Sequence, residues 1–179
     1  MSLPKEPRSW QKAGFLISTD KTLISVSAIN HAFSLDIVYW TQPVPETVVQ
    51  NIIDNSFCFG LYEVNSKQPG SADGQLDPKA DDLKQIGFAR IVGDMVTFAY
   101  LTDLYVLPEY QGLGLGGWII NCIGELLEEM PYLRWAMLRT SMEASQSAYE
   151  KRLGMAVLQS GDIKKGPVMM GRKGRVGGP

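Results

Sequence analysis

Hydrophobic and polar residues in the first third of the chain follow strand spacing and then helix spacing. Two short apolar runs flank the candidate turn Asp20-Lys21 and predict a first strand or hairpin within about 15–25. Apolar residues then recur every three or four positions over 27–40, which is typical of one face of a helix. The prolines that follow break this helix, and a second helix is predicted over 45–53.

The middle of the chain has the composition of β-strands. Aromatic and branched residues fill 57–64, 86–92 and 96–107, and the Gly93-Asp94 pair predicts a tight antiparallel hairpin between the last two. Residues 65–84 are polar, aperiodic and rich in glycine, proline and aspartate. This composition predicts a mobile surface loop.

The last third of the chain alternates helices and strands. Apolar spacing and the positions of Pro131 and Gly154 set the expected boundaries. The predicted elements are a helix over 118–127, a strand over 133–138, a helix over 145–153, and two strands at 155–158 and 167–170. The whole order of elements predicts a mixed α+β fold.

Length and charge narrow the possible functions. The chain has 179 residues, enough for one sizeable core but few for two domains. With 17 basic against 19 acidic residues it has no basic footprint for nucleic acid or an anionic membrane, so neither partner is expected. The N-terminus lacks the apolar core of a signal peptide, and no apolar run reaches the roughly 18 residues of a membrane span. We therefore expect a cytoplasmic protein.

The residue types that bind metals are too sparse for a metal site. Cys58 and Cys122 are the two cysteines and lie far apart in the sequence, and His31 is the only histidine. Zinc ligation and a disulfide framework are therefore not expected.

A glycine cluster between a strand end and a helix start is the main candidate for binding chemistry. The glycines within 112–117 let the backbone curl, so that several N–H groups converge on one anion at the positive end of the helix. A Walker A loop is excluded because Trp118 stands where that motif requires lysine. The dinucleotide pattern G-x-G-x-x-G fits the spacing, but residues 108–111 separate it from the strand and the next strand does not end in an acidic residue.

Gln111, Gly114 and Gly116 give a third pattern, Q-x-x-G-x-G. This segment resembles motif A of the GCN5-related N-acetyltransferases (GNAT), R/Q-x-x-G-x-G/A, which binds the pyrophosphate of acetyl-coenzyme A. The likeness extends over 103–116 and over the later segment Tyr-Glu-Lys-Arg-Leu-Gly-Met at 149–155, which resembles the family's tyrosine followed by Gly-Phe. A turn that is merely rich in glycine is the alternative interpretation.

The resemblance implies an architecture and its boundaries. We expect a GNAT-like central, mostly antiparallel sheet of about seven strands flanked by about four helices. An acetyltransferase domain is expected over 15–170, after an N-terminal extension over 1–14. The composition of 171–179 predicts a disordered tail.

The resemblance also implies a cofactor site for acetyl-coenzyme A, without a metal. In this family the fourth strand splays from the fifth and pairs with the pantetheine arm, which implies backbone contacts from Leu104, Tyr105 and Val106. An N–H near Tyr105 is also expected to stabilise the oxyanion that forms on the thioester carbonyl. The pyrophosphate is expected on the residues of the loop, namely Gln111, Gly112, Leu113, Gly114, Leu115, Gly116 and Gly117.

Tyr149 is the candidate general acid, because a phenol within hydrogen-bond reach can protonate the coenzyme A thiolate. It lies five residues before Gly154, whereas the family usually has four. One extra helical residue turns a side chain by about 100°, which predicts that the phenol misses the sulfur unless the helix absorbs the residue. A tyrosine that only packs on the sheet is the alternative.

Asp103 is the candidate general base for an ammonium acceptor, and a carboxylate that only anchors a neighbouring backbone or loop is the alternative. Side chains alternate along a strand, so Asp103 is expected to face away from Tyr100 and Thr102 unless a bulge intervenes. Glu63 is expected to join them through water.

These residues predict an acetyl-coenzyme A-dependent N-acetyltransferase that transfers the acetyl group to a primary amine, of a small molecule or a peptide, by direct attack in a ternary complex. The acceptor is expected to be recognised by the segments 27–56 and 65–84. A non-catalytic acyl-coenzyme A-binding sensor or interaction module of the same fold is the alternative, and a homodimer is left open.

Overall fold

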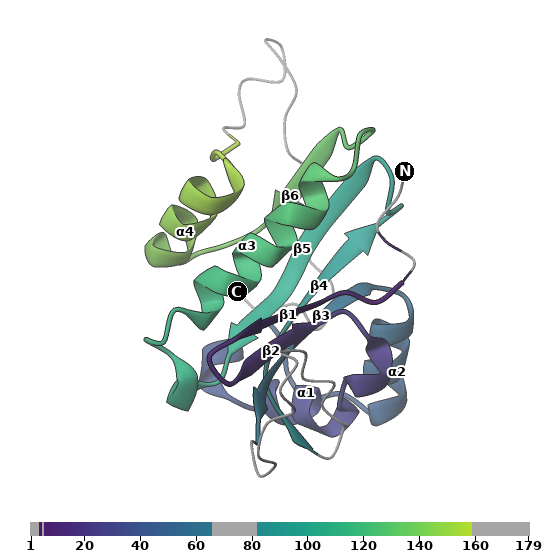
Figure 1. Ribbon diagram of the computed structural model, residues 1–179, viewed down its shortest axis with the longest axis vertical. Coiled ribbons are helices and arrows are strands. Elements are labelled where there is room, and N and C mark those ends of the chain that lie inside the picture. Colours follow the sequence, from purple (N-terminus) through teal and green to yellow (C-terminus); the bar gives the residue numbers. More distant parts are fainter. Residues whose placement is uncertain (1–3, 5, 66–81, 159–179) are drawn as a thin grey trace, which may run out of the picture.

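One sheet with helices on both faces makes up the described part of the protein (Figure 1). The computed structural model describes residues 4, 6–65 and 82–158. The strands are β1 (Ser9–Lys12), β2 (Phe15–Ser18), β3 (Phe57–Val64), β4 (Leu83–Gly93), β5 (Phe98–Val106) and β6 (Trp135–Leu138). They lie across the sheet in chain order, and each pair is antiparallel except β5 and β6, which are parallel. The mixed α+β fold and the mostly antiparallel sheet are confirmed, and the described residues form six strands where about seven were expected.

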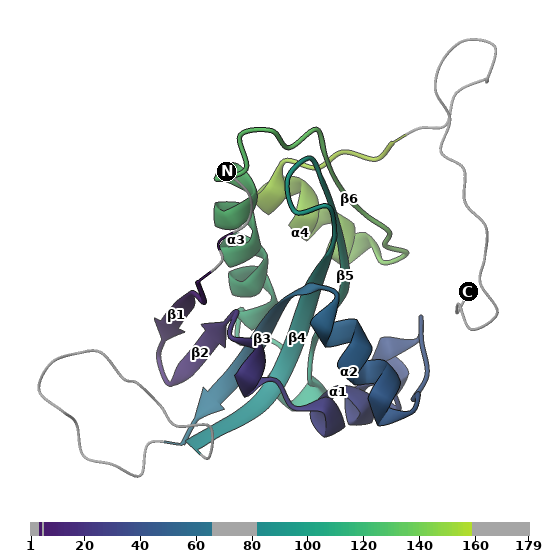
Figure 2. The same ribbon diagram turned by 90° about the vertical axis from the view of Figure 1, so that its right-hand side faces the viewer.

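The helices form two layers, one on each face of the sheet (Figure 2). They are α1 (Val26–Ala32), α2 (Glu46–Asp54), α3 (Leu115–Glu128) and α4 (Glu143–Leu153), in agreement with about four expected helices. Ile119 and Ile123 of α3 are fully buried in one apolar core, and α4 packs beside α3. Val49 and Ile53 of α2 are buried, with α1, in a second core on the opposite face. Their spacing of four residues puts them on one side of the helix.

The first hairpin is placed earlier than the sequence predicted. Strand β1 pairs with β2 through a turn at Ala13 and Gly14, which both have positive φ, 46° and 85°. Two consecutive residues of positive φ match the right-handed twist of the strands that they join. Asp20, the predicted turn residue, instead caps a 3-10 helix by accepting a hydrogen bond from the Thr22 N–H. The segment 1–14, predicted as an extension, therefore contributes a strand to the sheet.

The helix predicted over 27–40 is also shorter in the structure. Helix α1 ends at Ala32, and the chain continues through a separate 3-10 helix, η2 (Asp36–Val38). The Ser34 hydroxyl donates to the His31 carbonyl at the end of α1. This local hydrogen bond competes with the backbone hydrogen bonds that would extend the helix. Phe33 and Val38 still reach the core, so the apolar periodicity is satisfied by two short helices instead of one.

The elements predicted farther along the chain have mixed outcomes. Strands β3 to β6 and helices α2 to α4 match the sequence-based elements within a few residues, and Gly154 ends α4 with φ of 62°. Residues 155–158 do not form the predicted strand. The predicted strand at 167–170, the tail at 171–179 and most of the 65–84 loop lie outside the described residues.

Candidate active site

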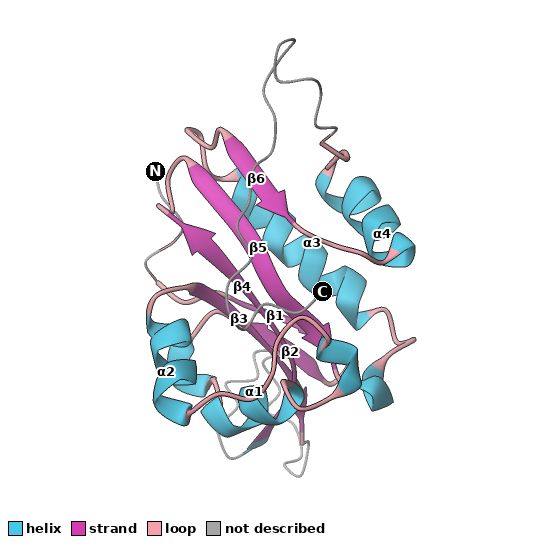
Figure 3. Cartoon of the chain, turned by 180° about the vertical axis from the view of Figure 1, so that it is seen from behind, coloured by secondary structure: helices cyan, strands magenta, loops and turns pink. Residues whose placement is uncertain are grey.

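The edge strand β6 is shorter than its neighbour β5 and pairs with only the first part of it (Figure 3). They pair only between Phe98–Leu101 and Trp135–Leu138, where β6 ends. Strand β5 continues to Val106, so no described strand pairs with this stretch of β5 on the β6 side. A free strand edge presents backbone N–H and C=O groups for pairing with another extended chain. Leu104, Tyr105 and Val106 lie on this stretch. Pairing with β4 directs the backbone groups of Tyr105 toward Phe88, so those of Leu104 and Val106 face the open side.

A cavity of about 200 Å³ opens where the two strands part. Its walls come from β5, the end of β6, the loop that leads into α4, α4 itself and the residues after η2. The lining residues include Tyr39, Trp40, Thr102, Asp103, Leu104 and Tyr149. The cavity thus brings together both catalytic candidates with one of the residues expected to bind the cofactor.

Tyr149 lines this cavity despite its unusual distance from Gly154. Helix α4 docks on α3, where Leu153 lies against Gly124, and this docking sets which face of α4 meets the sheet. Burial, and to a smaller extent the neighbouring Tyr39, raise the pKa of the Tyr149 phenol. The Tyr39 hydroxyl in turn forms a hydrogen bond with the Ser141 hydroxyl, which links the segment after η2 to the loop before α4.

Asp103 lies on a β-bulge that sequence alternation does not predict. Its φ is 54°, and the pairing of β4 with β5 shifts register between Phe88 and Arg90. The bulge inserts one residue into the alternation, so Asp103 is on the same face as Thr102, whose hydroxyl donates to Asp103 Oδ1 at 3.3 Å. The two side chains therefore do not face oppositely. The bulge is the exception that the sequence-based expectation allowed.

Both carboxylate oxygens of Asp103 have strong partners. Arg90 Nε donates to Oδ2 at 2.6 Å, and Trp40 Nε1 donates to Oδ1 at 3.1 Å. The Arg90 guanidinium also donates to the Ser56 hydroxyl at 3.1 Å. Asp103 is only 8% exposed, so this is a largely buried ion pair joining β4, β5 and the segment after η2.

The glycine loop joins the end of β5 to the start of α3. Gly112 and Gly114 have φ of 81° and 75°, and Gly114 is the N-cap of α3. Only glycine adopts such conformations readily, and turns of this kind commonly form anion-binding concavities of successive N–H groups. A Cβ atom added at either position would meet no heavy atom within 4 Å, so the space outside the loop is open. This geometry fits a bound phosphate group.

Side-chain contacts hold the loop against the sheet. Gln111 Nε2 donates to the Val106 carbonyl at 3.0 Å, which closes the loop onto the end of β5. The Tyr110 hydroxyl donates to Glu63 at 2.7 Å and accepts from Lys84 Nζ at 2.9 Å. Glu63 therefore takes part in anchoring the loop, whereas sequence analysis expected it beside Asp103.

Comparison with known proteins agrees with this geometry. The sequence profile of the acetyltransferase (GNAT) family matches residues 39–155. A fungal protein from Gibberella zeae, named provisionally as an acetyltransferase, is 37% identical over 161 residues, which cover 90% of each chain. This chain belongs to the GNAT family.

Solved structures of GNAT proteins show the same fold. A provisionally assigned GNAT acetyltransferase from Xanthomonas campestris is 30% identical, with a TM-score of 0.61 over 83% of this chain and 88% of that one. A GNAT-family acetyltransferase from Streptococcus pneumoniae is 18% identical, with a TM-score of 0.55 over 90% of this chain and 98% of that one. At 18% identity the second comparison supports the fold alone.

The candidate site contains residues that the sequence patterns did not indicate. Arg90 and Trp40 bind Asp103, and Tyr39 contacts the loop before α4. Arg90 lies within a predicted strand, where an isolated charge among apolar residues was the available signal. Trp40 and Tyr39 carried no such signal, because their neighbours across the cavity are more than 60 positions away in the sequence.

The Tyr105 side chain packs in the core and is not among the residues that line the cavity. Its side chain is buried in the second core, and burial raises its pKa far above the ordinary value. Its backbone pairs with Phe88 of β4, because the Leu107 N–H donates to the Ile86 carbonyl and hydrogen-bonded pairs alternate along an antiparallel ladder. No described group of three or more His, Cys, Asp or Glu side chains converges as a metal site would, and no described helix has the length and apolar character to cross a bilayer.

Proposed function

We propose that this GNAT protein is an acetyl-coenzyme A-dependent N-acetyltransferase that acts on a primary amine in a ternary complex. The proposal is carried by the unpaired side of β5, which connects the two parts of the site. It runs from the cavity, which Tyr149 lines, to the backbone amides of the glycine loop.

The chain offers separate contacts for each part of the cofactor. Leu104 and Val106, on either side of Tyr105, present backbone groups to the pantetheine arm, as pairing with a further strand would require. The backbone from Gln111 to Gly117 receives the diphosphate at the start of α3. Bound acetyl-coenzyme A supplies the acetyl group through its thioester carbonyl.

Tyr149 is the proposed general acid. The amine nitrogen forms a bond to the acetyl carbon, the carbon–sulfur bond breaks, and the Tyr149 hydroxyl gives its proton to the departing sulfur. The raised pKa keeps the Tyr149 phenol protonated at neutral pH, as a general acid requires, although it also makes the phenol a weaker proton donor to the thiolate.

Asp103 is proposed to act in the same cavity as Tyr149, and its hydrogen-bond partners indicate which role it has. A proton taken from the acceptor ammonium would remove the negative charge that the Arg90 guanidinium and the Trp40 N–H contact. These contacts favour a positioning role, in which Asp103 fixes the bulge and the Trp40 ring beside the cavity, over the base role predicted from sequence. The ammonium proton then leaves to solvent in the open cavity.

Release of free thiol from acetyl-coenzyme A, measured across a panel of primary amines, tests the proposal. Amine-dependent thiol release above the hydrolysis background is expected, and it should require Tyr149. Tight coenzyme A binding with no turnover of any amine would overturn the enzymatic proposal and favour the acyl-coenzyme A sensor. Failure to bind coenzyme A would overturn both.

A further inference from the structure

The proposed diphosphate site lacks a positive side chain of its own. Residues 111–117 contain no lysine or arginine, and Gln111 turns its side-chain amide inward to the Val106 carbonyl. Backbone amides and the dipole of α3 supply only partial charges. A coenzyme A diphosphate and its 3′-phosphate carry several negative charges, so a nearby cation would add substantially to binding.

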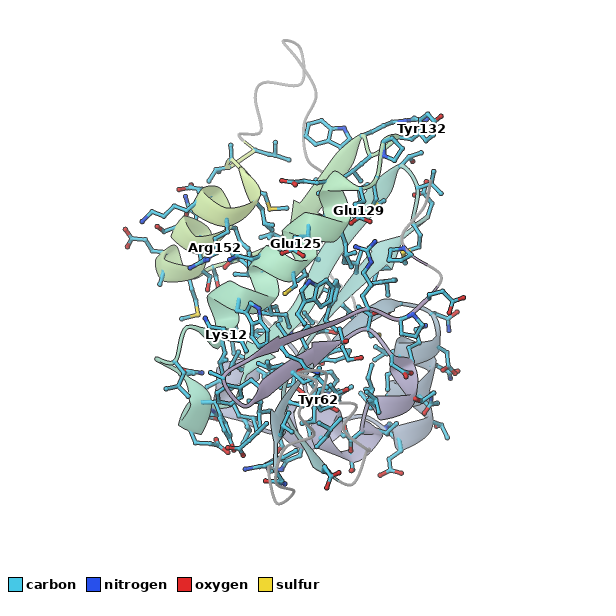
Figure 4. All side chains as sticks on the ribbon, viewed as in Figure 1. Lys12, Tyr62, Glu125, Glu129, Tyr132 and Arg152 are labelled. Carbon is cyan, nitrogen blue, oxygen red and sulfur yellow. The ribbon has the colours of Figure 1, made fainter. Side chains whose placement is uncertain are left out.

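Arg152 brings such a cation from another helix. It is an exposed residue in the last turn of α4, and Figure 4 shows it between α4 and α3. Its Nη1 donates to Asn121 Oδ1 on α3 at 2.9 Å. A Cβ atom added at Gly117, in the first turn of α3, would lie 2.6 Å from Arg152 Nη2 and 2.9 Å from Nε. The guanidinium therefore occupies the space that the absence of a side chain at Gly117 leaves.

This position is unfavourable for a cation in the absence of an anion. The first turn of α3 is the positive end of the helix, and it contains no acidic residue. Arg152 has no acidic partner among the described residues. A guanidinium has five N–H donors, and the Asn121 contact uses one of them. Donors thus remain for a planar, bidentate contact with phosphate oxygens.

Arg152 could instead stabilise helix α4 itself, without binding a ligand. Cations in the last turn of a helix interact favourably with its negative end, and Lys151 shares that turn of α4 with Arg152. Lys151 is exposed and forms no hydrogen bond or ion pair with the described residues of α3, whereas Arg152 reaches across to Gly117 and Asn121. Comparing substitutions of the two residues therefore distinguishes an effect on the stability of α4 from an effect on binding at the start of α3.

We propose that Arg152 binds a phosphate group of the cofactor at the start of α3 and supplies the charge that the glycine loop lacks. This inference rests on the proposed function, because it requires coenzyme A at that loop. The phosphate is either the diphosphate or the 3′-phosphate of the adenosine, and both present the same oxygens to a guanidinium.

Equilibrium binding of coenzyme A and of dephospho-coenzyme A to the full chain, by calorimetry, tests the proposal without any turnover. The variants are Arg152→Gln, Arg152→Lys and the matched control Lys151→Gln, which removes the same charge from the same helical turn. We expect Arg152→Gln to raise the Kd for coenzyme A about tenfold and Lys151→Gln to leave it within about twofold. Arg152→Lys should fall between them, because it keeps the charge and loses the bidentate fork. The ligand-free melting temperatures of Arg152→Gln and Lys151→Gln should agree.

The two ligands identify the phosphate concerned. Equal weakening of both ligands by Arg152→Gln assigns the contact to the diphosphate, and weakening of coenzyme A alone assigns it to the 3′-phosphate. The proposal is overturned if the native protein binds coenzyme A and Arg152→Gln binds it equally well, or if Lys151→Gln weakens binding as much. If the native chain binds neither ligand, the proposed function fails first and this inference fails with it.

Discussion

Replacement of Asp103 by asparagine tests the central ion pair of the site. Asparagine keeps the size of the side chain and tolerates the left-handed backbone at φ of 54°, so the bulge itself is not strained. The substitution removes the charge that faces the Arg90 Nε at 2.6 Å. The new amide has only one oxygen, so in either orientation its NH₂ group faces one of the two donors. Arg90 or Trp40 then loses its hydrogen-bond acceptor.

The expected loss of stability follows from the burial of the pair. Removing one partner of a buried ion pair costs about 3–5 kcal/mol, because the other charge is left uncompensated. The Arg90 side chain is 19% exposed and keeps its hydrogen bond to Ser56, so we expect the lower end, about 3 kcal/mol. In a domain of this size that corresponds to a fall in Tm of about 6–12 °C.

Circular dichroism during thermal and urea unfolding measures this loss without relying on Trp40 fluorescence, which the substitution itself perturbs. The control is Glu128→Gln, which neutralises an exposed carboxylate on α3 and should change stability by less than about 0.5 kcal/mol. In a double-mutant cycle, Arg90→Gln with Asp103→Asn should lose less than the sum of the single changes. A loss below about 1 kcal/mol for Asp103→Asn, or simple additivity in the cycle, would refute the reasoning.

The same variant separates the two roles of Asp103 in catalysis. If Asp103 positions the site, Asp103→Asn should retain measurable turnover at low temperature, with an unchanged shape of the pH–rate profile. If Asp103 is the base, the acid limb of that profile should disappear together with nearly all of kcat.

Three further predictions concern single features of the structure. Tyr149→Phe should lower kcat by about 10²-fold or more while the Kd for coenzyme A changes little, because only the proton donor is lost; a kcat within threefold of the native value in the thiol-release assay would exclude Tyr149 as the acid. Gly114→Ala should destabilise the protein by about 1 kcal/mol and weaken coenzyme A binding, since φ of 75° strains a residue with a Cβ; urea unfolding and calorimetry measure the two effects, and unchanged stability would contradict the strain. The Asp94 carboxylate accepts bonds from the Thr97 hydroxyl and from the N–H groups of Val96, Thr97 and Phe98, which hold its pKa below the ordinary value of 3.8. Its stabilisation is therefore present at neutral pH and is lost as the pH falls below about 3.8 toward the lower folded-state pKa, so Asp94→Asn should lose less Tm than the native protein between pH 7 and pH 3; equal losses would contradict the assignment.

Local sequence patterns were sufficient to predict most elements and the central motif. The strand that leads into the glycine loop, the helix that follows it, and α4 with its end at Gly154 are all encoded by contiguous residues. Apolar periodicity and glycine positions are local properties, so they predict elements without knowledge of the fold. The resemblance to the GNAT family depended on the same contiguous segment and is confirmed by the comparisons.

Tertiary structure alone decided which side chains meet at the site. The bulge that turns Asp103 toward Thr102 changes strand alternation by one residue, and no local pattern marks it. The direction of Tyr149 depends on how α4 docks on α3, because a helix presents every face until packing selects one. The contacts of Asp103 with Trp40 and of Arg152 with α3 join segments distant in the sequence, and only the packing of those segments against each other brings the charges and their partners together.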